Sequence, residues 1–220
     1  MGYTAIDSLI PNICANGVDA ILVGGSIIGG SNFDNFVKGV KSHSTVPVII
    51  FPGNSTQLSR HADAIFFLSL ISGRNPEYLI GEHVKASPII KEFGLEVIPT
   101  GYLLIESGNL TSVLFMSHTL PIPRDKLDIA KYHALAAEYL GMKFVYLDAG
   151  SGAQKSIPEE MISTIKDYIS IPILVGGGIR SPEDARSKVE AGAQGIIIGT
   201  VLQENQKLIK DFALAIHKKG

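Results

Sequence analysis

The sequence predicts an α/β fold of the TIM or (β/α)8 barrel type that lacks the first of its eight strands. Short β-branched runs alternate with longer segments of helical periodicity, and the β-branched runs are continuously apolar. Continuous apolar strands are typical of a parallel sheet whose two faces are both covered. Glycine-rich turns follow the last strands, where barrels frequently hold phosphate. A dinucleotide-binding open sheet instead carries its glycine loop after the first strand, so the barrel is favoured.

Seven strands can be assigned along the chain. They are Ala20–Gly24, Val46–Phe51, Ala64–Leu68, Glu96–Pro99, Phe144–Leu147, Ile173–Val175 and Gly195–Ile198. The preceding segment, Ala5–Gly17, has helical periodicity interrupted at Pro11, and it leads directly into the strand at Ala20. The missing element is therefore the first strand and its loop, about 15–20 residues by the usual length of such a unit.

The missing strand has a consequence for assembly. An open sheet edge exposes unpaired backbone groups. Either the start of the chain is truncated, or a neighbouring subunit or the chain's own tail covers the gap. We expect a homo-oligomer, for which light scattering will not give a monomer.

Helical periodicity fills the intervals between the strands. Apolar residues recur at three- and four-residue steps over residues 127–140, and Gly141 is a natural C-terminal stop. Ser181 begins another helix, because a capping hydroxyl is followed by Pro182 and two acidic residues. Gly192 ends that helix before the last strand.

Length and composition indicate one domain over residues 1–220. Apolar residues make up 45% and charged residues 18%, and the net charge of −2 without a basic block argues against a nucleic-acid partner. The longest apolar stretch, Ala64–Ile71, is far too short for a transmembrane segment, and residues 1–7 lack the pattern of a secretory signal. Cys14 stands alone, which excludes a disulfide frame and a thiolate zinc site. We therefore expect a cytoplasmic protein.

Three glycine-rich turns carry the functional prediction. They are Tyr146–Ala153, Val175–Ser181 and Ile198–Thr200, each directly after a predicted strand. Consecutive exposed N–H groups of such turns form an anion-binding nest. Because the carboxyl ends of parallel strands lie at one edge of a sheet, the three turns are predicted to converge on one phosphate. The alternative is that they are tight barrel corners without a ligand.

The chain resembles geranylgeranylglyceryl phosphate synthase and its bacterial relatives that make heptaprenylglyceryl phosphate. The matching stretches are Asp19–Ser26, Phe51–Asn54, Ala62–Leu70, Arg74–Pro76, Glu96–Tyr102, Pro121–Lys126, Ala134–Gly141, Tyr146–Ala153, Gly176–Ser181 and Gly199–Thr200. They cover nearly the whole chain. The Tyr-Leu-acid-Ala-Gly-Ser-Gly run and the Ile-Pro-Thr-Gly-Tyr run are specific, whereas the late glycine turns alone are not.

The resemblance implies a prenyltransferase of lipid biosynthesis. The family joins the hydroxyl of sn-glycerol 1-phosphate to C1 of a long-chain prenyl diphosphate and releases diphosphate, with Mg²⁺ as cofactor. By resemblance, the glycerol phosphate is bound by Tyr146, Leu147, Asp148, Ala149, Gly150, Ser151, Gly152, Gly177, Gly178, Gly199 and Thr200. Asp148 and Tyr146 are the predicted catalytic residues, with Asp148 accepting from the glycerol hydroxyls and acting as base.

The sequence departs from the family at two positions. The family usually has Glu in place of Asp148, so the carboxylate is one methylene shorter here. The family's main Mg²⁺ ligand is an aspartate at the end of the first strand. Asp7 is too close to the strand at Ala20 to take that place and is predicted to lie in the first helix. The metal-ligand position that remains is Ser26, at the end of the next strand.

Structural roles are the alternatives for several of these residues. Asp148 caps nearby backbone N–H groups in one alternative, and Ser26 caps the next turn. Residues 124–126 form a solvated helix start rather than a diphosphate contact. The six histidines are scattered without the spacing of metal ligands on one helix face. Two other functions stay open: an inactive, truncated phosphate-binding barrel, and a barrel enzyme for another phosphorylated small molecule.

Overall fold

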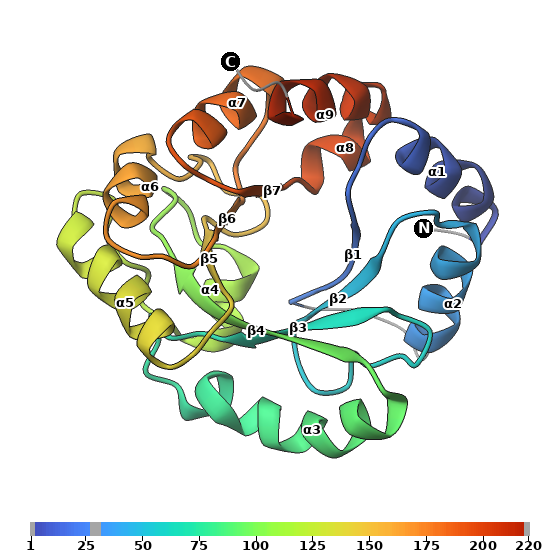
Figure 1. The fold of residues 1–220 in the computed structure, drawn as a ribbon, viewed down its shortest axis with the longest axis horizontal. Coiled ribbons are helices and arrows are strands. Elements are labelled where there is room, and N and C mark those ends of the chain that lie inside the picture. The colour runs from blue at the N-terminus through green and yellow to red at the C-terminus, as the bar shows by residue number, and fades with distance from the viewer. Residues whose placement is uncertain (1–2, 27–31, 218–220) are drawn as a thin grey trace. The chain divides into compact units, whose positions relative to one another are not determined.

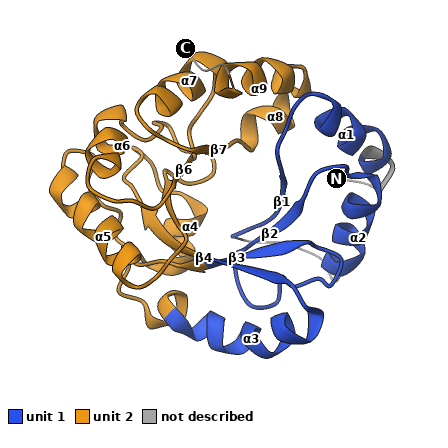
Figure 2. Ribbon diagram, viewed as in Figure 1, with its two compact units in different colours: residues 1–67, 80–98 blue, residues 68–79, 99–220 orange. Residues whose placement is uncertain are grey.

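The chain has the predicted α/β class. The structure is a computed structural model that describes residues 3–26 and 32–217. It contains two compact units, residues 1–67 with 80–98 and residues 68–79 with 99–220 (Figure 2). Strands and helices alternate along most of the chain from α1 to α9, although β3 follows β2 and α5 follows α4 directly (Figure 1). Its organisation as a single domain stays a prediction.

The first unit is a parallel sheet with helices packed against it. Its elements are α1 (Tyr3–Ala15), β1 (Ile21–Gly25), α2 (Phe33–His43), β2 (Val48–Pro52), most of β3 (Ala64–Ser69), the end of the π-helical turn η1 (Glu77–Gly81) and α3 (Glu82–Phe93). β1 pairs in parallel with β2, and β2 pairs in parallel with β3. The core of this unit contains Ile6 of α1, Val37 of α2 and Ile90 of α3, together with Ile50 of β2.

The first helix differs from the sequence prediction at Pro11. The interruption expected there is absent, since α1 is continuous from Tyr3 to Ala15. Proline removes one backbone donor from a helix interior. Ile6 and Ile10 are buried in the core of the unit, and their packing stabilises the helix around the proline. Asp7 lies in this helix as predicted, exposed and away from any strand end.

The second unit carries the remaining strands, again all parallel. Its elements are most of β4 (Glu96–Leu104), α4 (Ser112–Ser117), α5 (Leu127–Tyr139), β5 (Phe144–Asp148), α6 (Glu159–Lys166), β6 (Ile173–Gly176), α7 (Pro182–Glu190), β7 (Gly195–Ile197), α8 (Thr200–Glu204), the 3-10 turn η2 (Gln206–Leu208) and α9 (Ile209–His217). β4 pairs with β5, β5 with β6, and β6 with β7.

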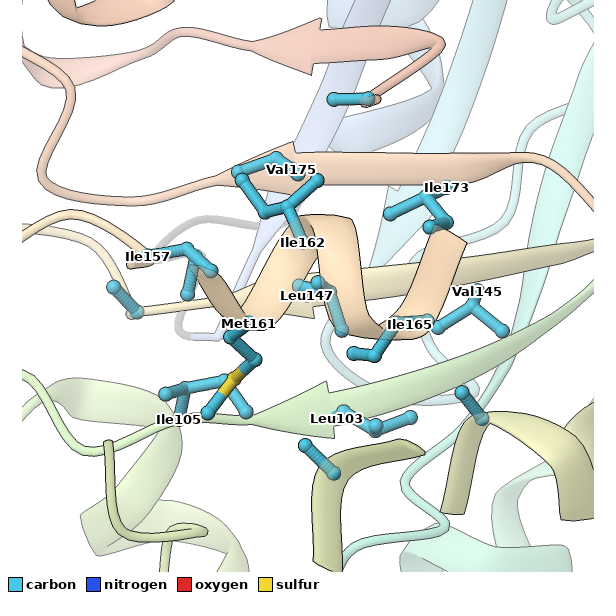
Figure 3. Packing of buried hydrophobic residues seen from close by; sticks show 14 of the residues in the cluster. Leu103, Ile105, Val145, Leu147, Ile157, Met161, Ile162, Ile165, Ile173 and Val175 are labelled. Atoms are coloured by element: carbon cyan, nitrogen blue, oxygen red, sulfur yellow. The ribbon is translucent and has the colours of Figure 1, made fainter. Parts of the chain in front are cut away.

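The core of the second unit fixes which strand residues are available for a site. Figure 3 shows Val145 and Leu147 of β5 among the side chains of α6, including Met161 and Ile165. Successive side chains of a strand point to opposite faces. Tyr146, like Asp148, therefore lies on the face of the sheet away from α6.

All seven predicted strands are present, and their bounds agree within two residues except at one end. β4 was predicted to stop at Pro99 but continues to Leu104. Pro99 does not end the strand, since its carbonyl accepts a hydrogen bond from the N–H of Lys143. Gly101 is needed inside the strand, because a Cβ there would lie 2.6 Å from the Cβ of Ala137 on α5.

The helix signals are confirmed as well. α5 ends at Tyr139 and is followed by Gly141 with φ of 77°. The hydroxyl of Ser181 caps α7 by accepting a hydrogen bond from the N–H of Asp184. Within residues 3–26 and 32–217, no helix has the length and apolar character needed to cross a membrane.

Candidate active site

The three glycine-rich turns come together in the second unit. They follow the carboxyl ends of β5, β6 and β7, which pair as neighbours. The hydroxyl oxygens of Ser151 and Thr200 lie 3.5 Å apart, which joins the first turn to the third. A Cβ on Gly177 would lie 2.7 Å from the backbone nitrogen of Gly150, which joins the second turn to the first. The predicted convergence is therefore present.

The glycines of these turns divide into two groups. Gly177 and Gly178 have φ of 80° and 71°. A Cβ on Gly177 would lie 2.7 Å from the backbone of Gly150 in the first turn, and a Cβ on Gly178 would lie 2.8 Å from the backbone of Lys155, just after that turn. Close packing therefore requires these two glycines with or without a ligand, as the alternative for these turns expects. Gly152 and Gly199 have no atom within 4 Å of a built Cβ. These two line open space.

The turns also present backbone donors. The N–H groups of Ser151, Gly152, Gly178 and Thr200 have no acceptor among residues 3–26 and 32–217. The side chains of Ser151 and Thr200 are exposed and add two hydroxyl groups. Backbone N–H groups and hydroxyls of this kind are the donors that an anionic oxygen requires.

Asp148 is the buried acidic group of the site. Its Oδ1 accepts hydrogen bonds from the N–H of Gly150 at 2.8 Å and from the hydroxyl of Tyr146 at 3.1 Å. Its Oδ2 accepts a short hydrogen bond from the hydroxyl of Tyr102 on β4. The bond to Gly150 is the backbone capping that the alternative for Asp148 describes. Three donors from three segments therefore hold one carboxylate.

Burial dominates the ionisation of this cluster. Burial raises the pKa of Asp148 above its ordinary value, and the hydrogen bonds from Tyr102, Gly150 and Tyr146 offset part of that rise. Burial and the charge of Asp148 raise the pKa of both tyrosines well above 10. Both tyrosines are therefore neutral donors at physiological pH.

Sequence reasoning assigned no role to Tyr102. The specific Ile-Pro-Thr-Gly-Tyr run, which ends at Tyr102, could have indicated a role for this residue. The strand was, however, predicted to end three residues earlier, at Pro99. In β4 Tyr102 is the register partner of Tyr146, and their ring centroids lie 5.3 Å apart. Gly176 leaves room beside them, because a Cβ there would lie 2.3 Å from the Tyr146 hydroxyl.

Two residues with predicted binding roles have side chains that point elsewhere. Leu147 and Ala149 are fully buried in the hydrophobic core of the second unit. Their backbone alone remains available to a ligand.

Ser26 lies in the first unit, directly after β1, and is half-buried. The loop beside it is held by Gln57, whose side chain donates to the carbonyl of Gly25 and accepts from the N–H of Gly53. The glycine segment that follows, 27–31, lies outside the described residues. Among the residues that the structure describes, no three His, Cys, Asp or Glu side chains gather as a metal site.

A pocket of about 310 Å³ lies beside the turns in the second unit. Its apolar walls include Leu104, Leu114 and Pro121. The loop after β4 forms another wall and also holds the first glycine turn, because Asn109 Oδ1 accepts from the N–H of Gln154 at 3.1 Å. The loop after β4 thus lines the apolar pocket and contacts the segment that directly follows the first glycine turn.

A model of the PcrB family matches residues 3–216. The chain belongs to the PcrB family. Among its relatives, a geranylgeranylglyceryl phosphate synthase of Chitinophaga pinensis is 49% identical over 212 residues, which are 96% of this chain and 84% of the relative. The synthase of Pyrococcus horikoshii is 45% identical over 193 residues, 87% of this chain and 75% of the relative.

Solved structures agree with this membership in the PcrB family. The crystal structure of (S)-3-O-geranylgeranylglyceryl phosphate synthase from Thermoplasma acidophilum, in complex with sn-glycerol-1-phosphate, has a TM-score of 0.93 and 34% identity. The match covers 98% of this chain and 88% of that one. The resemblance and the TIM-barrel type of fold stated from the sequence are both confirmed.

Proposed function

We propose that this chain is a prenyltransferase that joins a long-chain prenyl diphosphate to sn-glycerol 1-phosphate. The observation that carries this proposal is the Thermoplasma acidophilum structure, since its ligand is sn-glycerol-1-phosphate and its fold matches this chain at a TM-score of 0.93. The convergence of Ser151, Gly178 and Thr200 supplies donors suited to the phosphate of that substrate. Both alternatives from the sequence, an inactive barrel and a different phosphorylated substrate, lack such support.

The reaction forms an ether bond and breaks a phosphoester bond. The glycerol hydroxyl oxygen attacks C1 of the prenyl group, and the electron pair of the C1–O bond leaves with diphosphate. The hydroxyl proton passes to a base, for which Asp148 is the candidate. The turns hold the phosphate end, so that the hydroxyl lies near the carboxylate.

The residues present do not by themselves form a Mg²⁺ site. Mg²⁺ prefers carboxylate and phosphate oxygens in octahedral geometry, and Ser26 offers one hydroxyl. No acidic cluster accompanies Ser26 among the described residues. The Mg²⁺ requirement stays a prediction of the resemblance. Removal of divalent ions with EDTA, followed by addition of Mg²⁺ alone, tests it.

The prenyl tail requires an apolar surface near the glycerol phosphate. The pocket with Leu104, Leu114 and Pro121 offers such a surface. Leu110 and Leu120 are 77% and 86% exposed and extend the apolar character of this region. The cytoplasmic location and the homo-oligomeric state stay predictions from the sequence.

Incubation with both substrates tests the proposal. We expect sn-glycerol 1-phosphate and a mixture of prenyl diphosphates with Mg²⁺ to yield prenylglyceryl phosphate, detected by mass. Asp148→Asn should lower kcat at least a hundredfold, about what one general base supplies. The enantiomer sn-glycerol 3-phosphate is the matched control. Glycerol phosphate binding without product would favour the inactive barrel, and neither binding nor product would favour another phosphorylated substrate.

A further inference from the structure

The carboxylate of Asp148 accepts a hydrogen bond from Tyr102 on the neighbouring strand, a residue to which no role has been assigned. The register between β4 and β5 places Tyr102 beside Tyr146 and Leu104 beside Asp148. The Tyr102 hydroxyl reaches one residue along the sheet and donates to Oδ2 of Asp148. Tyr102 and Asp148 are 8% and 6% exposed, so water does not replace this bond readily.

Several described segments of the second unit surround Asp148. β4 contributes Tyr102, β5 contributes Tyr146, and the turn contributes the N–H of Gly150. β6 contributes glycines at 176 and 177, and a Cβ on Gly177 would lie 2.8 Å from Oδ1. None of these groups carries a charge.

The donor count leaves one acceptor position. An ionised carboxylate has about four lone-pair sites. Gly150 and Tyr146 occupy the two on Oδ1, and Tyr102 occupies one on Oδ2. One site on Oδ2 therefore receives no donor from residues 3–26 and 32–217 and is available to a substrate hydroxyl. The direction in which this lone-pair site points depends on Tyr102, because the Tyr102 hydroxyl donates to the same oxygen.

We propose that Tyr102 is a positioning residue for the transfer reaction. Its hydroxyl fixes Oδ2 of Asp148, so that this oxygen presents its remaining lone pair to the glycerol hydroxyl. This proposal rests on the proposed function.

A structural role and a positioning role predict different results. Loss of a buried hydroxyl lowers stability in either case. The positioning role requires that Tyr102 favour the charged form of Asp148, because a carboxylate that loses a donor in a buried place binds its proton more tightly. It also requires that glycerol phosphate kinetics change with it. The test is therefore the pKa of Asp148, read independently of turnover.

The measurement is the titration of the Asp148 carboxyl carbon by 13C NMR, assigned with Asp148→Asn. Tyr102→Phe should raise the pKa of Asp148, because the carboxylate loses a hydrogen-bond donor. Incorporation of 3-fluorotyrosine at position 102, a stronger donor of nearly the same size, should lower it. Tyr132→Phe, an exposed tyrosine on α5, is the matched control and should leave it unchanged. An unchanged pKa in both position-102 variants would overturn the proposal, and the fluorinated variant keeps the test valid if Tyr102→Phe fails to fold.

Kinetics then connect the titration to the reaction. In Tyr102→Phe, the acidic limb of kcat/KM should move to higher pH by the same amount. KM for glycerol phosphate should rise about tenfold, while KM for the prenyl diphosphate should stay unchanged. Shifted titration without any product from the unmodified chain would contradict the proposed function but not the coupling of Tyr102 to Asp148. Normal turnover with unshifted titration would contradict the role of Tyr102 alone.

Discussion

The hydroxyl oxygens of Ser151 and Thr200 lie 3.5 Å apart, although the two residues are separated by 49 positions in the chain. The pair links the turn after β5 to the start of α8, which follows β7. Both hydroxyls are exposed. Gly152 and Gly199 are their neighbours in the chain, and a Cβ built on either glycine meets no atom within 4 Å.

We expect Ser151→Ala and Thr200→Val each to raise KM for sn-glycerol 1-phosphate about tenfold, because a hydrogen bond to a charged group contributes roughly 1.5–3 kcal/mol. Steady-state kinetics with the prenyl diphosphate saturating measure this. KM for the prenyl diphosphate and the behaviour of Ser163→Ala, whose hydroxyl donates within α6, are the controls. Equal KM values in variant and parent would show that the phosphate lies elsewhere.

Crowding at Gly178 should make its substitution costly. Gly178 has φ of 71° and its Cβ would lie 2.8 Å from the backbone of Lys155. Gly94 has nearly the same φ, 69°, with no atom near its Cβ. Gly94→Ala should lower the free energy of unfolding by about 1 kcal/mol from strain alone, and Gly178→Ala by roughly 2–4 kcal/mol. Urea unfolding compares them, and equal losses would contradict the crowding.

Gly101 and Ala137 should show compensating substitutions. Gly101→Ala places a Cβ 2.6 Å from that of Ala137 and should cost about 1–3 kcal/mol of stability through overpacking. Ala137→Gly alone should cost about 1 kcal/mol, since glycine weakens a helix interior. The double variant should be more stable than the sum of the two losses predicts. Strict additivity in thermal or urea unfolding would show that α5 moves away from β4 instead.

Glu159 should make stability depend on pH at the acidic end. Burial raises its pKa, but hydrogen bonds from Lys188 at 2.6 Å and from Ser187 outweigh burial and lower the pKa from 4.5 to about 2. Because the folded pKa is depressed, the contribution is fully present above pH 4.5 and is lost as the pH falls to about 2.

The substitution Glu159→Gln tests this dependence. The Glu159 side chain is 51% exposed, so solvent screening limits the expected loss in the free energy of unfolding at pH 7 to about 1 kcal/mol. Urea unfolding over the pH series should show the difference from the parent shrinking between pH 4.5 and 2. Glu160→Gln, at the exposed neighbouring position, is the matched control. A constant difference at every pH would mean that the loss comes from packing.

The strands could be predicted from the sequence, but the side-chain hydrogen bonds between residues on different strands could not. Apolar runs and glycine turns give the strand positions, because each signal is local. The end of β4 was predicted wrongly because Pro99 is a local stop signal, whereas the N–H of Lys143 keeps the strand paired beyond it. The bond from Tyr102 to Asp148 spans 46 positions and depends on strand register, which no local pattern contains.

The site residues followed the same division. The turns were predicted from their glycines and Asp148 from the family resemblance, and the structure brings them together. The separation of Gly177 and Gly178 from Gly152 and Gly199 required coordinates, because all four are glycines in similar runs. Binding of glycerol phosphate at these residues stays a prediction until the variants are measured.

The buried Tyr102–Asp148–Tyr146 cluster gives the chain an optical signal of its own. The chain has no tryptophan and seven tyrosines, so tyrosine dominates its near-ultraviolet absorption and emission. A phenol that donates to a carboxylate absorbs at longer wavelength and emits weakly, and two such phenols surround Asp148. A ligand that hydrogen-bonds to this carboxylate should change the absorption of the two phenol rings. An absorption difference spectrum should therefore record its binding without a label.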